Sequence, residues 1–476
     1  MEEIPLVNAL KKSAQKPHAA FYAPGHKQGK GCDRTILNLL GKDVFNADLP
    51  ELPELDNLFA PEGVIEEAQQ LASRTFGGEK TWFLVNGSTC GIMAAILATC
   101  GEGDKIILPR NIHQSAIAGL VLSGAIPIFI QPEYDSKEGL AYNVTPQAVQ
   151  QTLKEHPDTK AVMMLHPTYQ GVCSDLKAIA EIVHQYNIPL LVDEAHGAHF
   201  AFHDDLPPSA MSVGADLTVQ STHKTLSAMT QASMLHIQGT RICDRRVNKA
   251  LQLVQSTSPS YLLLASLDAA RHQMAIEGEE LIAKTIALAA KARNQLAAIP
   301  NLSILEPNTK PGCHHLDLTR LTINVSRLGI TGFEADEILH ERLNVTCELP
   351  LLHHLSFIIS LGNTPQDIQQ LIQACKTLTP PLPHSSTPLV PYSPTPLLPH
   401  SPRQAYFAPI ETIPVTQAGD RLCAELICPY PPGIPLLMPG EIITTEAIKY
   451  LQQVLAAGGT ITGCNDPTLQ TIQVLQ

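Results

Sequence analysis

Through the first half of the chain, short apolar segments of strand length alternate with longer segments of helical periodicity. A helix between two consecutive strands carries the chain back across the sheet, so the strands run parallel and helices cover both faces. The alternation therefore predicts an α/β fold with a mainly parallel, doubly covered sheet. Such a sheet binds its ligand beyond the carboxyl ends of its strands. The predicted strands are Trp82–Val85, Lys105–Leu108, Ile126–Ile130, Ala161–Leu165, Pro189–Val192, Leu217–Gln220 and Ser233–Ile237. The predicted helices between them are Val64–Thr75, Ser88–Thr99, Ser115–Leu122, Pro146–Lys154 and Leu176–Tyr186.

The second half of the chain predicts smaller pieces. Two helices are expected over Tyr261–Ile276 and Glu279–Ala298, followed by a small α/β segment with strands Leu321–Val325 and Leu355–Leu361 and helices Ala335–Arg342 and Pro365–Lys376. Nine of the 38 prolines lie between residues 379 and 403, where an eight-residue unit occurs twice in tandem. Proline at this density removes amide donors and prevents a helix, which indicates an extended linker. A docking site for a proline-binding module is the less favoured alternative.

These patterns divide the chain into five parts. We expect an N-terminal arm over 1–60, a large domain over 61–300, a small α/β segment over 301–378, a proline-rich linker over 379–403 and a C-terminal module over 404–476.

The amino-acid composition restricts the kinds of binding partner and the cellular location that we expect. The formal net charge of −13 argues against nucleic acid or anionic lipid as the main partner, since both attract cationic surfaces. No apolar run approaches the roughly 18–20 residues of a membrane span, and the first residues have no signal-peptide pattern. The eleven scattered cysteines favour reduced thiols and a cytoplasmic location over a disulfide framework or a zinc site.

Several reactive side chains follow predicted strands. Lys224 comes after the strand Leu217–Gln220 and could form a Schiff base, although a solvated loop lysine is the ordinary case for any single Lys. Asp193 ends another strand and could pair with a protonated ring nitrogen, cap a turn, or join His196 and His199 in a metal site, the weaker alternative.

Two more loops carry candidate ligands. The segment from Asn86 to Gly91 joins a strand to a helix, where hydroxyls and free amides can bind phosphate, although an ordinary N-cap at Ser88 is the commoner case. His113 follows another strand and could stack on a flat ring, whereas a lone loop histidine is more often a polar surface residue.

In chain order, a phosphate loop, a stacking histidine, an acid and a lysine each follow a strand of one predicted sheet. This is the layout of a fold type I (aspartate aminotransferase-like) pyridoxal phosphate (PLP) enzyme. The chain resembles the Orn/Lys/Arg decarboxylase family in its shorter form, without a receiver-like N-terminal wing domain. The matching segments are Ala23–Gly29, Asn86–Cys90, Pro109–His113, Asp193–His199, Gln220–Leu226, Gln231–Met234, Thr257–Tyr261 and Pro429–Glu441.

The resemblance implies a role for each matching residue. Lys224 binds PLP covalently, Asp193 pairs with the pyridine nitrogen, His113 stacks on one ring face and Ala195 packs on the other. The expected catalytic residues are Lys224, Asp193, His113 and His223, and either Lys224 or His223 returns the proton to Cα. The remaining cofactor ligands implied are Ser88, Thr89, Cys90, His196, Ser221 and His223, with Ser256 reaching the phosphate of the partner subunit. Cys90 departs from the hydroxyl residue that the family often has there, so only its backbone contact is expected.

The implied activity is PLP-dependent decarboxylation of a basic L-amino acid, arginine or lysine before ornithine, to a polyamine precursor. A homodimer with a shared active site, or a higher oligomer, is expected, and no metal. Arg421 and Glu441 are candidate substrate contacts, and so are the four carboxylates between Asp48 and Asp56, which equally suit a solvated acidic turn. The alternatives are an aminotransferase or aldolase, and a non-catalytic protein that keeps the fold.

Overall fold

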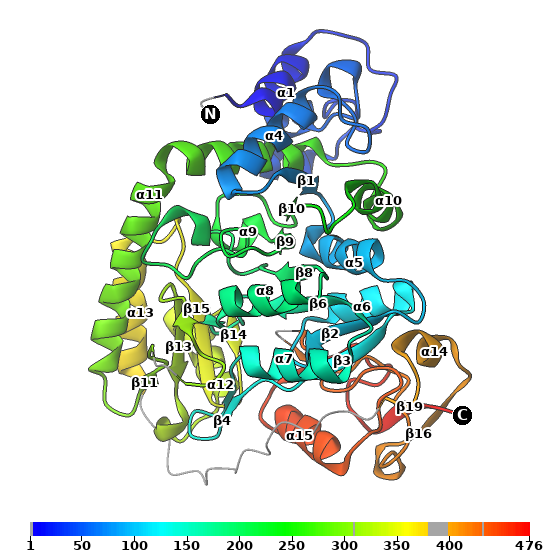
Figure 1. The fold of residues 1–476 in the computed structure, drawn as a ribbon. Coiled ribbons are helices and arrows are strands. Elements are labelled where there is room, and N and C mark those ends of the chain that lie inside the picture. The colour runs from blue at the N-terminus through cyan, green and yellow to red at the C-terminus, as the bar shows by residue number, and fades with distance from the viewer. Residues whose placement is uncertain (1–2, 308–309, 379–397, 431–432) are drawn as a thin grey trace. The chain divides into compact units, whose positions relative to one another are not determined.

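The computed structural model describes residues 3–307, 310–378, 398–430 and 433–476 (Figure 1). Most of the predicted linker, residues 379–397, lies outside the described residues. The chain forms two compact units. Unit 1 comprises Met1–Ala98 with Val192–Ile282, and unit 2 comprises Thr99–Leu191 with Ala283–Gln476. The four boundaries between the five parts expected from the sequence stay predictions.

The strands of unit 1 follow the order β1, β10, β9, β8. β10 runs antiparallel to both of its neighbours, pairing Met234 with Gln220 and Ser233 with Leu84. The end of β8 lies beside β9, where the Glu194 amide donates to the Val219 carbonyl at 2.9 Å. The bounds are β1 (Lys80–Leu84), β8 (Leu190–Asp193), β9 (Leu217–Gln220) and β10 (Ser233–Ile237). The predicted bounds of β9 and β10 are therefore confirmed, and β1 begins two residues earlier than predicted.

The helices of unit 1 include several that the sequence patterns did not predict, in the N-terminal arm and before residue 256. The helices that were not predicted are α1 (Pro5–Gln15), α2 (Arg34–Leu40), α3 (Lys42–Ala47), η1 (Pro53–Leu55), η2 (Phe200–Phe202), α9 (Thr222–Thr225) and α10 (Asp244–Val254). The predicted ones are α4 (Val64–Phe76), α5 (Gly87–Thr99) and the start of α11 (Tyr261–Ala297). Asp268 on α11 accepts the Leu6 amide at 3.0 Å, which satisfies a free donor in the first turn of α1.

The helix α11 corrects the prediction of two helices, because it is continuous through Gly278. A Cβ on Gly278 would lie 3.1 Å from both Met274 Cε and Phe202 Cδ1. This glycine therefore permits close packing and does not break the helix.

The parallel part of the sheet belongs to unit 2, where β2 runs parallel to β3 and to β6. The order is β8, β6, β2, β3, so the central sheet as a whole is mostly parallel. The bounds are β2 (Lys105–Pro109), β3 (Ile126–Ile130) and β6 (Thr159–Leu165), with helices α6 (Gln114–Ser123), α7 (Pro146–Glu155) and α8 (Leu176–Gln185). These agree with the predicted elements to within two residues at each end.

Unit 2 also contains an antiparallel four-stranded sheet in the order β11, β13, β15, β14, with α12 and α13. Its core includes Leu321, Ile323, Leu355 and Ile372, all fully buried. The bounds are β11 (Ser303–Ile304), β13 (Arg320–Asn324), β14 (Leu349–Pro350), β15 (His354–Ile358), η3 (Ser326–Leu328), α12 (Gly332–Leu343) and α13 (Pro365–Thr377), and two small ribbons pair β4 (Tyr134–Asp135) with β5 (Leu140–Ala141) and β7 (Val172–Cys173) with β12 (His315–Leu316).

The C-terminal part of unit 2 has a hydrophobic core of its own, which includes Ile427, Ile443, Leu451 and Val474. Its elements are α14 (Pro402–Phe407), β16 (Ile410–Pro414), η4 (Val415–Gln417), β17 (Cys428–Tyr430), α15 (Thr445–Ala456), β18 (Thr460–Thr462) and β19 (Thr471–Leu475), with β16 paired to β19 and β17 to β18.

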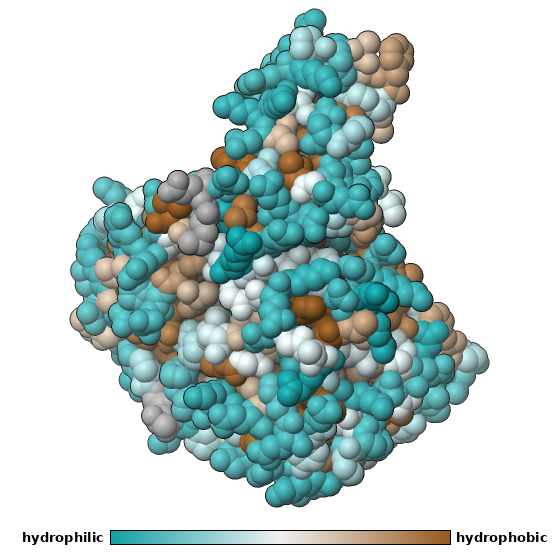
Figure 2. Space-filling model, turned by 45° about the horizontal axis from the view of Figure 1, so that its top comes forward, coloured by the Kyte–Doolittle hydropathy of each residue, from teal (hydrophilic) through white to brown (hydrophobic). Residues whose placement is uncertain are grey.

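On the face drawn in Figure 2, hydrophilic residues predominate and the apolar ones form small separate patches. Among the described helices, none combines the length and the apolar character that a membrane crossing requires.

We predict that Gly91→Ala lowers the free energy of unfolding by about 1–3 kcal/mol. Gly91 lies on α5, and a Cβ there would come within 2.6 Å of Val219 Cγ1 on β9 and 2.7 Å of Leu84 Cδ1 on β1. Denaturant unfolding of Gly91→Ala and wild type would measure the difference. The matched control is Gly362→Ala, where an added Cβ meets nothing within 4 Å. Equal unfolding midpoints for Gly91→Ala and wild type would contradict this packing.

Candidate active site

Lys224 and Asp193 lie at the ends of neighbouring strands of unit 1. Asp193 is the last residue of β8, and Lys224 lies in the short helix α9 directly after β9. The Asp193 carboxyl is buried and accepts the Ala195 amide at 3.1 Å. Burial raises the pKa of Asp193, and the positive charge of Lys224 acts against that rise. A cationic ring N–H beside this carboxylate would offset the cost of its burial.

His196 contacts the lysine directly, since Lys224 Nζ lies 2.9 Å from His196 Nε2. A protonated amine can only donate, so Nε2 of the buried imidazole accepts and Nδ1 carries the ring proton. The His223 ring is oriented by the opposite nitrogen, because its Nδ1 lies 3.0 Å from the Ala232 carbonyl and must donate to it. His196 therefore contacts Lys224 through Nε2, whereas His223 is held by the backbone through Nδ1.

The loop that begins α5 offers a place for an anion. Ser221 Oγ donates to Ser88 Oγ at 2.7 Å, and Thr89 is exposed beside them. The first amides of this 13-residue helix have no intrahelical partners, and its dipole favours negative charge there. Cys90 points inward: its thiol donates to the Gly87 carbonyl at 3.1 Å, and burial raises its pKa to about 12.

The end of α10 supports this loop. Gln255 Oε1 accepts the Val85 amide at 2.7 Å, and Asn86 Oδ1 accepts the Ser256 amide at 3.1 Å. Ser256 is exposed and lies next to the phosphate loop of its own chain. The sequence patterns did not identify Gln255. The signal that could have pointed to it is its position directly before Ser256, a residue that the family resemblance did name.

A buried polar chain crosses the sheet of unit 1 behind these residues. Thr81 Oγ1 lies 2.8 Å from His236 Nδ1, and His236 Nε2 lies 3.2 Å from Gln220 Oε1. The Gln220 amide donates to Glu194 at 2.7 Å, and the Ala210 amide donates to the other carboxyl oxygen at 2.7 Å. Burial raises the pKa of Glu194 to about 8 and lowers that of His236 to about 3. Sequence patterns did not identify this series of hydrogen bonds, although Glu194 and Gln220 directly adjoin the candidate site residues Asp193 and Ser221.

His113 belongs to unit 2, where it caps α6. The Ser115 amide donates to its Nδ1 at 3.2 Å, so Nδ1 is unprotonated in this geometry. The other side of the ring faces the C-terminal module, because a Cβ on Gly433 would lie 3.3 Å from His113 Nε2.

The other candidate substrate contacts are engaged within the chain. Arg421 donates to the Leu475 carbonyl at 2.9 Å and pairs with Glu411, and Glu441 forms a buried ion pair with Arg110. Their predicted contact with substrate stays a prediction. In the acidic segment each carboxylate accepts a hydrogen bond from its own chain; the acceptors are Asp48, Glu51, Glu54 and Asp56.

The metal alternative has no counterpart in the parts of the chain that the structure describes. Asp193, His196 and His199 do not form a three-ligand group there. Asp193, Lys224 and the N-terminus of α5 fit PLP instead, because a buried carboxyl, a lysine amine and a helix N-terminus with hydroxyls are the donor set that its ring nitrogen, aldehyde and phosphate require.

Two family models match the chain. The one described as "Orn/Lys/Arg decarboxylase, major domain" matches residues 4–350, and the one for the C-terminal domain matches residues 392–467. The chain belongs to the Orn/Lys/Arg decarboxylase family. It is a PLP-dependent amino-acid decarboxylase, and the resemblance drawn from its motifs is confirmed.

Individual relatives agree with this assignment. Arginine decarboxylase of Bacillus subtilis is 40% identical over 481 residues, covering 100% of this chain and 98% of the relative. Arginine decarboxylase of Bacillus anthracis is 38% identical over 480 residues, covering 100% and 97%. The crystal structure of the Francisella novicida lysine decarboxylase LdcF superposes with a TM-score of 0.85 at 22% identity, over 100% of this chain and 82% of that one. The predicted fold type I architecture is thereby confirmed.

We predict that Glu194→Gln flattens the dependence of stability on pH. Because the folded pKa is raised from 4.5 to about 8, the folded carboxyl between these values holds a proton that the unfolded one has released. The free energy of unfolding of wild type therefore falls as pH rises, by at most about 1.4 kcal/mol per pH unit. Unfolding measured from pH 5 to pH 9 in both proteins tests this. An equal slope in the variant would contradict the buried neutral carboxyl.

Proposed function

We propose that this enzyme decarboxylates L-arginine, releasing CO₂ and the corresponding guanidino amine. The proposal is carried by full-length similarity of 38–40% to two proteins named arginine decarboxylase. Lysine is the second candidate, because the superposing solved structure is a lysine decarboxylase. Ornithine follows these two.

In this proposal Lys224 binds PLP covalently and Asp193 holds the ring nitrogen in its protonated form. Bound PLP supplies a conjugated ring into which the electron pair left by the Cα–carboxylate bond can flow. The buried Asp193 carboxylate would stabilise positive charge at the ring nitrogen. Ser88, Thr89, Ser221 and the first amides of α5 would hold the phosphate, and His113 and Ala195 would contact the ring.

Proton movement depends on the groups around Lys224. The 2.9 Å contact lets His196 Nε2 take a proton from Lys224 Nζ, which leaves the amine able to act as a nucleophile. After CO₂ leaves, a proton must return to Cα, and Lys224 Nζ or His223 is its donor. Gln220 and Glu194 keep the strand ends that carry Ser221 and Asp193 in place.

We further propose that the enzyme works as a cytoplasmic homodimer that makes polyamine precursors. Ser256 is exposed, and its hydroxyl, which accepts the Ser258 amide at 3.1 Å, would turn toward a phosphate group of the partner subunit. The cysteines are present as free thiols, which suits a reducing compartment.

We expect the purified protein with PLP to release CO₂ from arginine faster than from lysine or ornithine. Incubation with each amino acid, followed by measurement of CO₂ and amine, tests this. Faster release from lysine would reassign the substrate, and a keto-acid product in the presence of an amino acceptor would favour an aminotransferase.

We predict that Lys224→Ala reduces turnover to background and removes the visible absorbance of the lysine-linked cofactor, because the variant lacks the amine. Asp193→Asn keeps the size of the side chain without its charge, and should lower kcat by about 10²- to 10³-fold. Asp244→Asn is the control, since Asp244 forms an exposed ion pair with Lys80 in the same unit. Activity retained in Lys224→Ala would place the nucleophile elsewhere.

A further inference from the structure

We propose that the C-terminal module positions His113 through the buried ion pair between Arg110 and Glu441. Both are positioning residues in this inference, and neither is required to touch the substrate. The inference rests on the proposed role of His113 against the cofactor ring, and every contact that supports it lies within unit 2.

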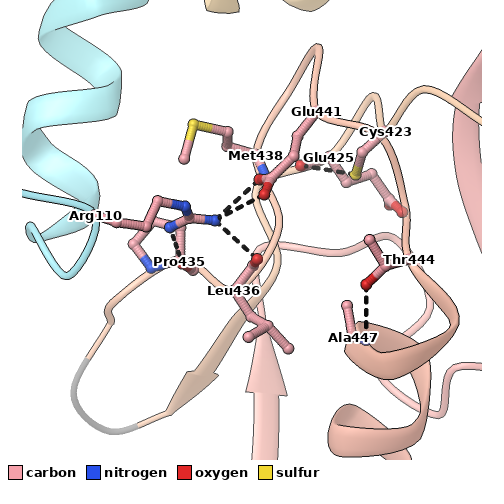
Figure 3. Close-up of polar contacts among 9 residues, drawn as sticks. All are labelled: Arg110, Cys423, Glu425, Pro435, Leu436, Met438, Glu441, Thr444 and Ala447. Carbon is pink, nitrogen blue, oxygen red and sulfur yellow. Dashed lines mark hydrogen bonds and ion pairs between the residues drawn. The ribbon is translucent and has the colours of Figure 1, made fainter. Parts of the chain in front are cut away.

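Arg110 directly follows β2 and directs its guanidinium into the turn between Pro435 and Glu441 (Figure 3). Its nitrogens donate to the Pro435 carbonyl at 2.6 Å, to the Leu436 carbonyl at 2.8 Å and to Glu441 Oε2 at 2.9 Å. The two side chains are only 3% and 5% exposed. A planar guanidinium with several donors can hold carbonyls and a carboxylate at once, which a lysine ammonium does less rigidly.

Glu441 shapes the same turn from its own side. Its Oε2 accepts the Met438 amide at 3.1 Å while it pairs with Arg110. Burial raises the pKa of Glu441, and the charge of Arg110 opposes that rise. Removing either partner would leave a buried charge uncompensated, so the turn and the arginine fix each other.

The segment that Arg110 holds begins against His113. The Gln114 amide donates to the Gly433 carbonyl at 3.1 Å, and Gly433 has a φ of +79°. A Cβ at this position would lie 3.0 Å from Gln114 Nε2 and 3.3 Å from His113 Nε2. A Cβ at this position would therefore strain the backbone, which has a positive φ, and would press on the imidazole of His113.

The ring is consequently fixed on two sides. The Ser115 amide holds Nδ1, and the backbone at Gly433 closes the Nε2 side. Arg110 binds carbonyls two and three residues beyond Gly433, so it determines where this backbone lies. A displacement of about 1 Å in a residue that contacts the reacting group can lower a rate by about 100-fold.

The test compares Glu441→Gln, Arg110→Lys and Gly433→Ala in the full-length, PLP-loaded enzyme. We expect each to shift the visible absorbance and circular dichroism of the bound cofactor and to lower kcat by about 10- to 100-fold, with a smaller change in the KM for arginine. Arg110→Lys keeps a charge pair, and Gly433→Ala leaves the pair intact, so these two decide the matter if Glu441→Gln does not fold. Asp158→Asn is the matched control: it removes an exposed ion pair with Lys105, at the other end of β2.

A double-mutant cycle identifies His113 as the intermediary. If the ion pair acts through His113, adding Arg110→Lys to His113→Ala lowers kcat little further than His113→Ala alone. Multiplicative losses, or variants with unchanged cofactor spectra and unchanged kcat in the folded protein, would overturn the inference. The spectra need no substrate, so a wild type that is inactive on arginine would count against the proposed function alone.

Discussion

The buried carboxyl of Asp193 is the constraint on which the active-site part of this structure depends. A carboxylate removed from water is strongly destabilising unless donors or positive charge compensate it. Here the Ala195 amide and the charge of Lys224 do so, and Lys224 in turn contacts His196. Placing an acid and an amine at adjacent strand ends therefore requires the loops that follow both strands to fold around them. That arrangement is also what a cofactor with a basic ring nitrogen and an aldehyde needs.

The need to pair every buried polar group also explains the contacts behind the site. Glu194, Gln220, His236 and Thr81 each use a neighbour to satisfy a buried polar atom, and these contacts link β1, β10 and β9 to the residue directly after β8. In unit 2 the same need is met by the ion pair between Arg110 and Glu441, which connects the C-terminal module to the loop after β2. Buried polar contacts cost more to break than they contribute when made, so they specify one arrangement of the loops.

Local patterns predicted the elements whose burial follows from their own composition. The bounds of β9 and β10 match the prediction because each is a buried run bounded by polar residues, and α7 begins at Pro146 after a Thr145 cap. The prediction of helix ends failed where a glycine within a helix serves close packing. Two helices, Tyr261–Ile276 and Glu279–Ala298, were predicted where the structure has a continuous α11, and the packing of Phe202 against Gly278 explains the glycine inside that helix.

The sequence by itself determined the fold class and the family, and it singled out the candidate lysine, acid and phosphate loop, because these motifs are short, ordered and placed after predictable strands. Only the tertiary structure decided that His196 contacts Lys224, that Gln255 supports the phosphate loop and that Glu441 meets Arg110 across 331 positions of chain. These pairings depend on which buried donors and acceptors the folded chain brings together. Contacts between residues so far apart in the chain produce no periodicity or spacing in the sequence. The motifs could therefore identify the residues but not the partners that each one contacts.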